Sequence, residues 1–326
     1  MNSTPGIAHI ACHFPAGRQD NAELAERFGF ELEFLRDKVG VRTRAVAAPE
    51  ETVSDLAAAA ARKLFEKGVA DPGEVQLLVV CTQTPDYRLP ATANIVQHAL
   101  GLPQTTAAFD IGQGCSGWVV GLSAVRSMMA AEGLDCALLI TAETYSKFID
   151  PADRATSPLF GDAAAATLLR SGAGGRIGRF VFGSDGSGAA SLIIRGGGGR
   201  RPLDPPVGEN GLRMDGKAIF NFMMRRVPDC VRRCLAANGL AQEDVDLFVF
   251  HQASRFMLAN LAKHMGLPEN KVPVVLEDTG NTVSSTIPAT LERLAAEGRL
   301  AGRTVLAAGF GVGLSWAATT ITFPKE

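Results

Sequence analysis

Short, almost uninterrupted apolar runs alternate along this chain with longer segments whose apolar residues recur at helical spacing. The run 75–81 is nearly all apolar, which indicates a strand covered on both faces of a sheet. The segment 52–67 instead places Val53, Leu56 and Leu64 on one face of a predicted helix. The strands expected in the first half are 7–14, 75–81, 106–111, 136–141 and 161–169, and the expected helices are 21–27, 52–67, 91–100 and 118–125.

The second half of the chain repeats this order of elements. Its expected helices are 218–238 and 284–297, and its expected strands are 245–251, 272–276, 304–308 and 319–322. Cys81 and His251 end matching strands, and Gly114 and Gly280 precede matching helices at nearly the same separation. The pattern therefore predicts a duplicated α/β unit, each copy with a mixed sheet between helix layers.

A glycine-, proline- and arginine-rich stretch at 171–210 separates the two copies. Its glycine run lacks the Gly-Lys-Ser/Thr ending of a phosphate-binding loop, so it is interpreted as part strand and part connection. We expect an N-terminal half at 1–172 and a C-terminal half at 173–326.

Composition narrows the class of protein. The 326 residues suffice for a large core, and a net charge of −2 favours neither nucleic acid nor an anionic membrane as a partner. The uncharged run 304–324 approaches the length of a membrane span, but its glycines and β-branched residues predict two buried strands.

The six cysteines are scattered without paired short spacings, and the chain does not begin with a charged and then apolar leader. We therefore expect free thiols in a cytoplasmic protein. Cys230 and Cys234 lie four residues apart on a predicted helix, but no histidine or second cysteine pair accompanies them, so no metal site is expected.

Cys115 lies in a glycine-built turn between a predicted strand and a predicted helix. The small residues Gly112, Gly114 and Gly117 around it leave room for a substrate. The amides that open the next helix favour a thiolate, which predicts a nucleophile. The alternative from this turn alone is a buried core cysteine.

The duplication points to two further candidate site residues, His251 and Asn281, in addition to Cys115. Each follows a predicted strand or occupies the matching turn, and ligands of open α/β sheets bind at such strand ends. If the halves pack about a pseudo-twofold axis, these residues and the loop 310–313 meet in the middle. Taken singly, His251 could be a core histidine and Asn281 a turn residue, but matched positions favour a shared site.

These residues lie in a set of motifs that resembles the thiolase superfamily and, more narrowly, β-ketoacyl-acyl carrier protein synthase III. The motifs extend over nearly the whole chain in the order Asp110-Ile111-Gly112-Gln113-Gly114-Cys115-Ser116-Gly117, Phe160-Gly161-Asp162, His251-Gln252-Ala253-Ser254, Gly280-Asn281-Thr282 and Gly309-Phe310-Gly311-Val312-Gly313. The resemblance implies a five-layered αβαβα fold, a homodimer and a pantetheine tunnel.

The resemblance also implies a role for each residue. Cys115 would accept an acyl group from acyl-CoA, and the backbone amides of Cys115 and Val312 would form the oxyanion hole. His251 and Asn281 would donate hydrogen bonds to a malonyl thioester, carried by acyl carrier protein, as it loses carbon dioxide. The carbanion would attack the acyl group to give a β-ketoacyl thioester, without a metal or redox cofactor.

The substrate-binding residues depart from the family pattern. Phe34 stands where a tryptophan commonly stacks on the adenine of coenzyme A, with Arg154 expected on its other side. Leu89 stands where an aromatic residue of the partner subunit often lines the acyl pocket, to which we also assign Phe310.

Two further departures concern polar residues. Ser254 replaces the usual asparagine after the histidine motif, and Asn221 replaces a basic residue often used in carrier docking. The acyl chain, the extender, the carrier and the choice between fatty-acid initiation and a specialised pathway therefore stay open.

Other functions remain to be weighed. The order Cys, His, Asn also matches papain-like hydrolases, although the duplicated buried strands suit a tunnel better than an open cleft. An acyltransferase that does not decarboxylate, or a non-catalytic subunit of a heterodimeric synthase, is compatible with the fold. An inert subunit would have no need of Cys115, His251 and Asn281 together.

Overall fold

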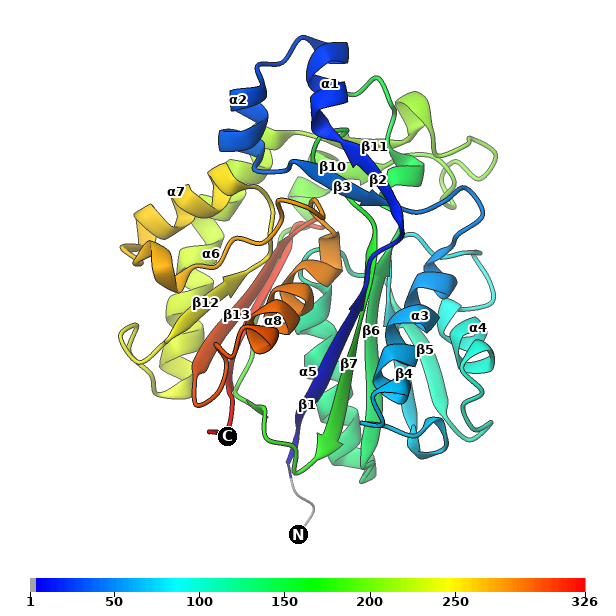
Figure 1. Cartoon of the computed structure of the whole chain (residues 1–326), viewed down its shortest axis with the longest axis vertical. Helices are drawn as coiled ribbons and strands as arrows, with labels where there is room; N and C mark the ends of the chain where they lie inside the picture. The colour runs from blue at the N-terminus through cyan, green and yellow to red at the C-terminus, as the bar shows by residue number, and fades with distance from the viewer. Residues whose placement is uncertain (1–3, 326) are drawn as a thin grey trace.

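The computed structural model describes residues 4–325 and shows two β-sheets that enclose a central pair of helices (Figure 1). The strands are β1 (Pro5–His13), β2 (Gly17–Asp20), β3 (Thr43–Val46), β4 (Leu77–Cys81), β5 (Ala107–Ile111), β6 (Cys136–Glu143), β7 (Ala163–Ser171), β8 (Arg176–Ile177), β9 (Val181–Ser184), β10 (Leu192–Ile194), β11 (Leu212–Met214), β12 (Leu247–Phe250), β13 (Thr304–Gly311) and β14 (Ser315–Thr322). The helices are α1 (Asn21–Phe28), α2 (Leu32–Phe34), α3 (Val53–Glu66), α4 (Thr92–Ala99), α5 (Gly117–Glu132), α6 (Gly216–Asn238), α7 (Arg255–Met265) and α8 (Thr286–Ala296).

The first sheet has the strand order β1-β7-β6-β4-β5, and the second has the order β12-β13-β14-β8, with β9 also paired to β14. Strands β4, β5 and β6 are parallel, as are β12 and β13, whereas β7 and β14 are antiparallel to their neighbours. Each half therefore contains a mixed sheet. Two small two-stranded sheets, β2–β3 and β10–β11, lie outside the two main sheets.

Three apolar clusters show how the layers stack. Helices α3 and α4 cover the outer face of the first sheet, and α6 and α7 cover the outer face of the second. Helices α5 and α8 fill the space between the sheets, where residues such as Trp118 and Leu291 contact both strand layers. The chain has the five-layered αβαβα thiolase-like fold that the resemblance implies.

Along the chain, the last strand of the first sheet is β7, which ends at Ser171. The next strand, β8, begins at Arg176 and pairs in the second sheet. This change of sheet supports a proposed division between 172 and 173. The stretch 171–210 contains β8, β9 and β10 as well as loops.

The prediction of a strand at 272–276 is wrong. This segment has no regular secondary structure and leads into a turn. Pro273 lacks an amide donor for a ladder. The Gln252 side chain supplies the missing partners, because it donates to the Pro273 carbonyl (3.3 Å) and accepts from the Val275 amide (3.0 Å).

Within residues 4–325, no helix has both the length and the apolar character needed to cross a membrane.

Candidate active site

Cys115 lies four residues after the end of β5 and two before the start of α5. Its side chain is buried, and the turn closes through a 2.7 Å hydrogen bond from the Gly117 amide to the Gly114 carbonyl. The loop after β13 packs directly on the sulfur. A Cβ at position 311 would lie only 2.7 Å from Cys115 Sγ, so glycine is required for this close approach.

The buried position determines the protonation state of Cys115. Burial raises the pKa of the thiol to about 12, although hydrogen bonding from the Val312 amide lowers it. Desolvation therefore opposes the thiolate that the amides opening α5 are expected to favour, and the thiol form predominates before substrate binds.

Val312 lies in the turn between β13 and β14, which pair in antiparallel register up to Gly311 and Ser315. Its backbone lowers the pKa of the Cys115 thiol, and the neighbouring Gly311 packs directly on that sulfur. A group added to that sulfur would be within reach of the Val312 amide, as a backbone oxyanion hole requires.

His251 follows the last residue of β12 and is buried. Its amide donates to the Ala308 carbonyl at 2.9 Å, so the parallel pairing with β13 continues for one more residue. The ring meets Phe310 edge to face, with centroids 5.7 Å apart. Burial lowers the pKa of His251 to about 3, so the imidazole is neutral.

Asn281 connects the two halves. Its amide donates to the Leu159 carbonyl at 2.8 Å, and its carbonyl accepts from the Gly161 amide at 3.1 Å. Its side-chain Oδ1 accepts from the Val283 amide at 2.9 Å, and its Nδ2 lies 3.4 Å from the Ala253 carbonyl. The preceding Gly280 has φ of +74°, a conformation that favours glycine.

The structure adds four residues that the sequence motifs did not indicate. Glu143 ends β6 as a buried carboxyl group that accepts from the Gln83 amide (3.1 Å) and the Thr84 hydroxyl (2.8 Å). The Tyr145 hydroxyl donates to Gln83 Oε1 at 2.7 Å. A charged residue at the end of an apolar run was the signal that could have identified Glu143.

Glu143 also affects the nucleophile electrostatically. Burial raises the pKa of Glu143 to about 8, while hydrogen bonds from Thr84 and Gln83 lower it. When ionised, Glu143 raises the pKa of Cys115 through its negative charge. The site thus holds a neutral histidine and a protonated thiol beside a buried acid.

The structure places Gly311 and Val312 at the Cys115 sulfur, and the preceding residue, Phe310, packs against His251. It does not bring Phe34, Arg154 or Leu89 into this buried site. Leu89 is 82% exposed, and Phe34 is 47% exposed on the short helix α2.

The aromatic group nearest to Arg154 is Phe30, which the sequence analysis missed. The Arg154 guanidinium lies 4.8 Å from the centre of the Phe30 ring, and Phe30 stacks on Phe34 with centroids 5.7 Å apart. Phe30 therefore contacts both Arg154 and Phe34.

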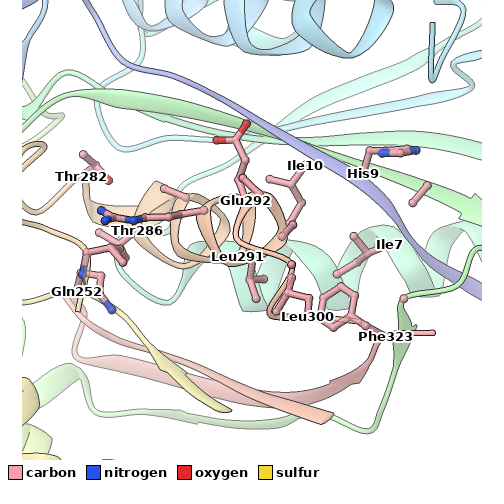
Figure 2. A pocket seen from close by; sticks show the side chains of 18 of the residues that line it. Ile7, His9, Ile10, Gln252, Thr282, Thr286, Leu291, Glu292, Leu300 and Phe323 are labelled. Atoms are coloured by element: carbon pink, nitrogen blue, oxygen red, sulfur yellow. Dashed lines mark hydrogen bonds between the residues drawn. The ribbon is translucent and has the colours of Figure 1, made fainter. Parts of the chain in front are cut away.

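A cavity of about 720 Å³ lies beside the segment 275–286 and α8, and Cys115 does not line it. Figure 2 shows Gln252, Thr282 and Thr286 at one end of it and Ile7 and Phe323 at the other. Among residues 4–325, no cluster of three or more His, Cys, Asp or Glu side chains is arranged to hold a metal ion.

Comparisons with known proteins agree with this architecture. Two family models match, 3-oxoacyl-[acyl-carrier-protein] synthase III at residues 109–186 and its C-terminal region at 235–323. The chain is 36% identical over 325 residues to a β-ketoacyl-[acyl-carrier-protein] synthase III of Symbiobacterium thermophilum, with 98% of each chain covered.

Solved structures give the same result. A crystal structure of 3-oxoacyl-(acyl-carrier-protein) synthase III is 42% identical, with a TM-score of 0.95 and coverage of 98% of this chain and 100% of that chain. The priming β-ketosynthase of the R1128 polyketide pathway is 32% identical, with a TM-score of 0.91 and coverage of 99% and 97%. The chain therefore belongs to the β-ketoacyl-acyl carrier protein synthase III family of condensing enzymes.

Proposed function

We propose that this enzyme transfers an acyl group from acyl-CoA to Cys115 and then condenses it with a malonyl thioester, with malonyl-acyl carrier protein as the extender. The observation that supports this most directly is the packing of the loop 311–312 on the buried Cys115 sulfur, where Gly311 leaves no room for a Cβ and Val312 lowers the pKa of the thiol. The neutral His251 and the side-chain amide of Asn281 supply donors without adding charge.

In the acylation step, the Cys115 sulfur attacks the thioester carbonyl. The oxygen of the tetrahedral intermediate is stabilised by the amides of Cys115 and Val312. Collapse of the intermediate breaks the bond to the coenzyme A sulfur, and the proton of the Cys115 thiol leaves with the coenzyme A thiol.

In the condensation step, loss of carbon dioxide from the malonyl group puts negative charge on its thioester oxygen. Hydrogen bonds from His251 and Asn281 to that oxygen stabilise the enolate. A neutral imidazole suits this role, because it donates without protonating the carbanion. The carbanion attacks the acyl group on Cys115 and breaks its bond to sulfur, which releases a β-ketoacyl thioester and the Cys115 thiolate. The thiolate then takes up one proton from solvent.

Coenzyme A would enter past the aromatic group of Phe30 and Phe34, with Arg154 beside them. Stacked aromatic rings next to a guanidinium are suited to an adenine ring. Pocket residues on the acyl side include Phe310 and, from a partner subunit, Leu89, whose 82% exposure in the single chain leaves it free to enter a partner's pocket.

We propose a homodimer that forms through β5. This strand is at the edge of the first sheet, and an open edge can extend its sheet by pairing with a second copy. The six cysteines are all free and buried, which supports a reducing, cytoplasmic compartment.

The pathway can be either fatty-acid initiation or a specialised acyl or polyketide route. The relative whose title describes polyketide priming supports the second possibility. The alternative of a papain-like hydrolase is rejected, because the chain matches a condensing enzyme over nearly its whole length.

Intact-protein mass spectrometry with a graded series of acyl-CoA substrates tests this proposal. Cys115 should gain the mass of the acyl group, and Cys115→Ala should not. Addition of malonyl-acyl carrier protein should release carbon dioxide and a β-ketoacyl product. Acylation without carbon dioxide release would instead indicate an acyltransferase, and no acylation by any substrate would indicate a non-catalytic subunit.

A further inference from the structure

The turn that opens α8 lies directly behind His251 and Asn281. Thr286, the first residue of α8, is buried, and its Oγ1 lies 2.8 Å from His251 Nδ1. The same oxygen lies 3.0 Å from the Val283 carbonyl. Thr286 has one hydroxyl proton, so the hydroxyl can donate to only one of these two acceptors.

The backbone indicates which acceptor takes that proton. The Val283 carbonyl already accepts from the backbone amide of Thr286, which closes the short helical turn before α8. Nδ1 has no backbone amide among its hydrogen-bond partners, and the Val283 carbonyl, which also faces the His251 ring, can only accept. A hydroxyl bond to Nδ1 therefore satisfies the ring nitrogen and leaves the carbonyl paired.

Val283 sets the geometry of this turn. It is the non-glycine residue with positive φ (+52°) among residues 4–325, a conformation that β-branched residues rarely adopt. Its amide can only donate, so it must face Oδ1 of Asn281, 2.9 Å away. The side-chain amide of Asn281 is thereby oriented with Nδ2 as the donor. One of its two protons faces the Ala253 carbonyl (3.4 Å), and the other is available to a substrate.

We propose that Thr286 is a positioning residue that donates its hydroxyl proton to Nδ1 of His251 and thereby holds the imidazole with its proton on Nε2. That nitrogen is then a hydrogen-bond donor to the malonyl thioester oxygen. The inference rests on the proposed function, because it explains how His251 serves as a neutral donor in decarboxylation. In the opposite tautomer, Nδ1 would donate and Nε2 would carry a lone pair that repels the enolate oxygen.

Three variants separate this role from a structural one. Thr286→Val keeps the shape and removes the hydroxyl, and Thr286→Ser restores a hydroxyl. Thr290→Val is the matched control, because Thr290 is a buried threonine of the same helix whose hydroxyl donates to the Thr286 carbonyl (2.8 Å). Without its hydroxyl donor, Nδ1 should take the proton and donate to the Val283 carbonyl.

The first measurement is the nitrogen NMR spectrum of protein labelled with ¹⁵N-histidine, in which protonated and unprotonated ring nitrogens are well separated. The chain has only five histidines, and the His251 signals are assigned by their loss in His251→Gln. Wild type, Thr286→Ser and Thr290→Val should show a proton on Nε2. Thr286→Val should show it on Nδ1.

The second measurement compares the two half-reactions. Thr286→Val should lose about 10²-fold in malonyl decarboxylation, similar to removal of one oxyanion donor, and keep acylation of Cys115. Thr286→Ser should recover most of the loss. A wild-type proton on Nδ1, or an unchanged tautomer and decarboxylation rate in Thr286→Val, would overturn the inference.

Failure of the proposed function has a different signature. If wild type neither accepts an acyl group nor releases carbon dioxide, the assigned reaction is wrong. The tautomer can still be read from the spectrum in that case, so the Thr286 hydrogen bond is tested independently of the reaction.

Discussion

At the scale of single residues, burial decides the chemistry of this site. Desolvation raises the pKa of Cys115 and lowers that of His251, so both groups are uncharged before substrate binds. A neutral pair avoids the cost of a buried unpaired charge. Protons therefore have to move during the reaction rather than before it.

The two half-reactions should respond differently to loss of the donors. His251→Ala and Asn281→Ala should each reduce malonyl decarboxylation by about 10²-fold, because each removes one donor to the enolate oxygen. Acylation of Cys115 should continue, since its oxyanion is held by backbone amides. Carbon dioxide release and intact mass measure the two steps separately. Equal loss of both steps would contradict this assignment.

Removal of the Glu143 charge should make Cys115 easier to deprotonate. Glu143 has a pKa of about 8, so it is ionised at alkaline pH, where its charge raises the pKa of Cys115. Glu143→Gln should therefore shift the rise of iodoacetamide alkylation of Cys115 to lower pH. Glu143→Asp, which keeps the charge, is the control. No shift, or a shift to higher pH, would show that Glu143 is not the controlling charge.

At the scale of elements, the site depends on how closely loops approach each other. The turn between β13 and β14 reaches the Cys115 sulfur only because residue 311 is glycine. The strand and helix around Cys115 could be predicted from local patterns. The contact between these loops could not, because they are almost 200 residues apart.

Gly311→Ala should block acylation. Its Cβ would lie 2.7 Å from Sγ and 2.8 Å from Cβ of Cys115, so the sulfur or the loop must move. We expect at least about a tenfold loss of acylation, since small displacements of reacting groups are costly. Gly112→Ala is the matched control, because its Cβ would meet no atom within 4 Å. Equal acylation rates for both variants would contradict the close approach.

The segment 272–276 shows where local pattern fails. Its apolar residues predict a strand, but a strand also needs a partner for its backbone groups. Here the Gln252 side chain provides those hydrogen bonds instead, and Pro273 cannot join a ladder. That arrangement depends on contacts between distant residues.

At the scale of the whole molecule, duplication places the two sheets on either side of α5 and α8. The halves share the bridge between Phe160 and Asn281, so the asparagine of the candidate site is held by the opposite half. A change in how the halves pack would therefore alter the site directly.

The proposed dimer can be tested at its sheet edge. Phe109 on β5 is 37% exposed, and Phe109→Lys places a charge on the strand that would pair with the second copy. Light scattering should show a dimer for wild type and a monomer for Phe109→Lys. Val274→Lys, a similarly exposed position outside the sheets, should remain dimeric. A monomeric wild type would rule out this interface.

The sequence by itself determined the buried strands, most of the helices, the repeat and the motifs around Cys115, His251 and Asn281. Those features depend on apolar periodicity and on turn residues close together in the chain. Only the tertiary structure decided the burial that raises the pKa of Cys115, the contact of Phe30 with Arg154 and the hydrogen bonds of Glu143 and Thr286. These properties depend on burial and on the groups that each side chain meets, and both arise when distant segments pack together.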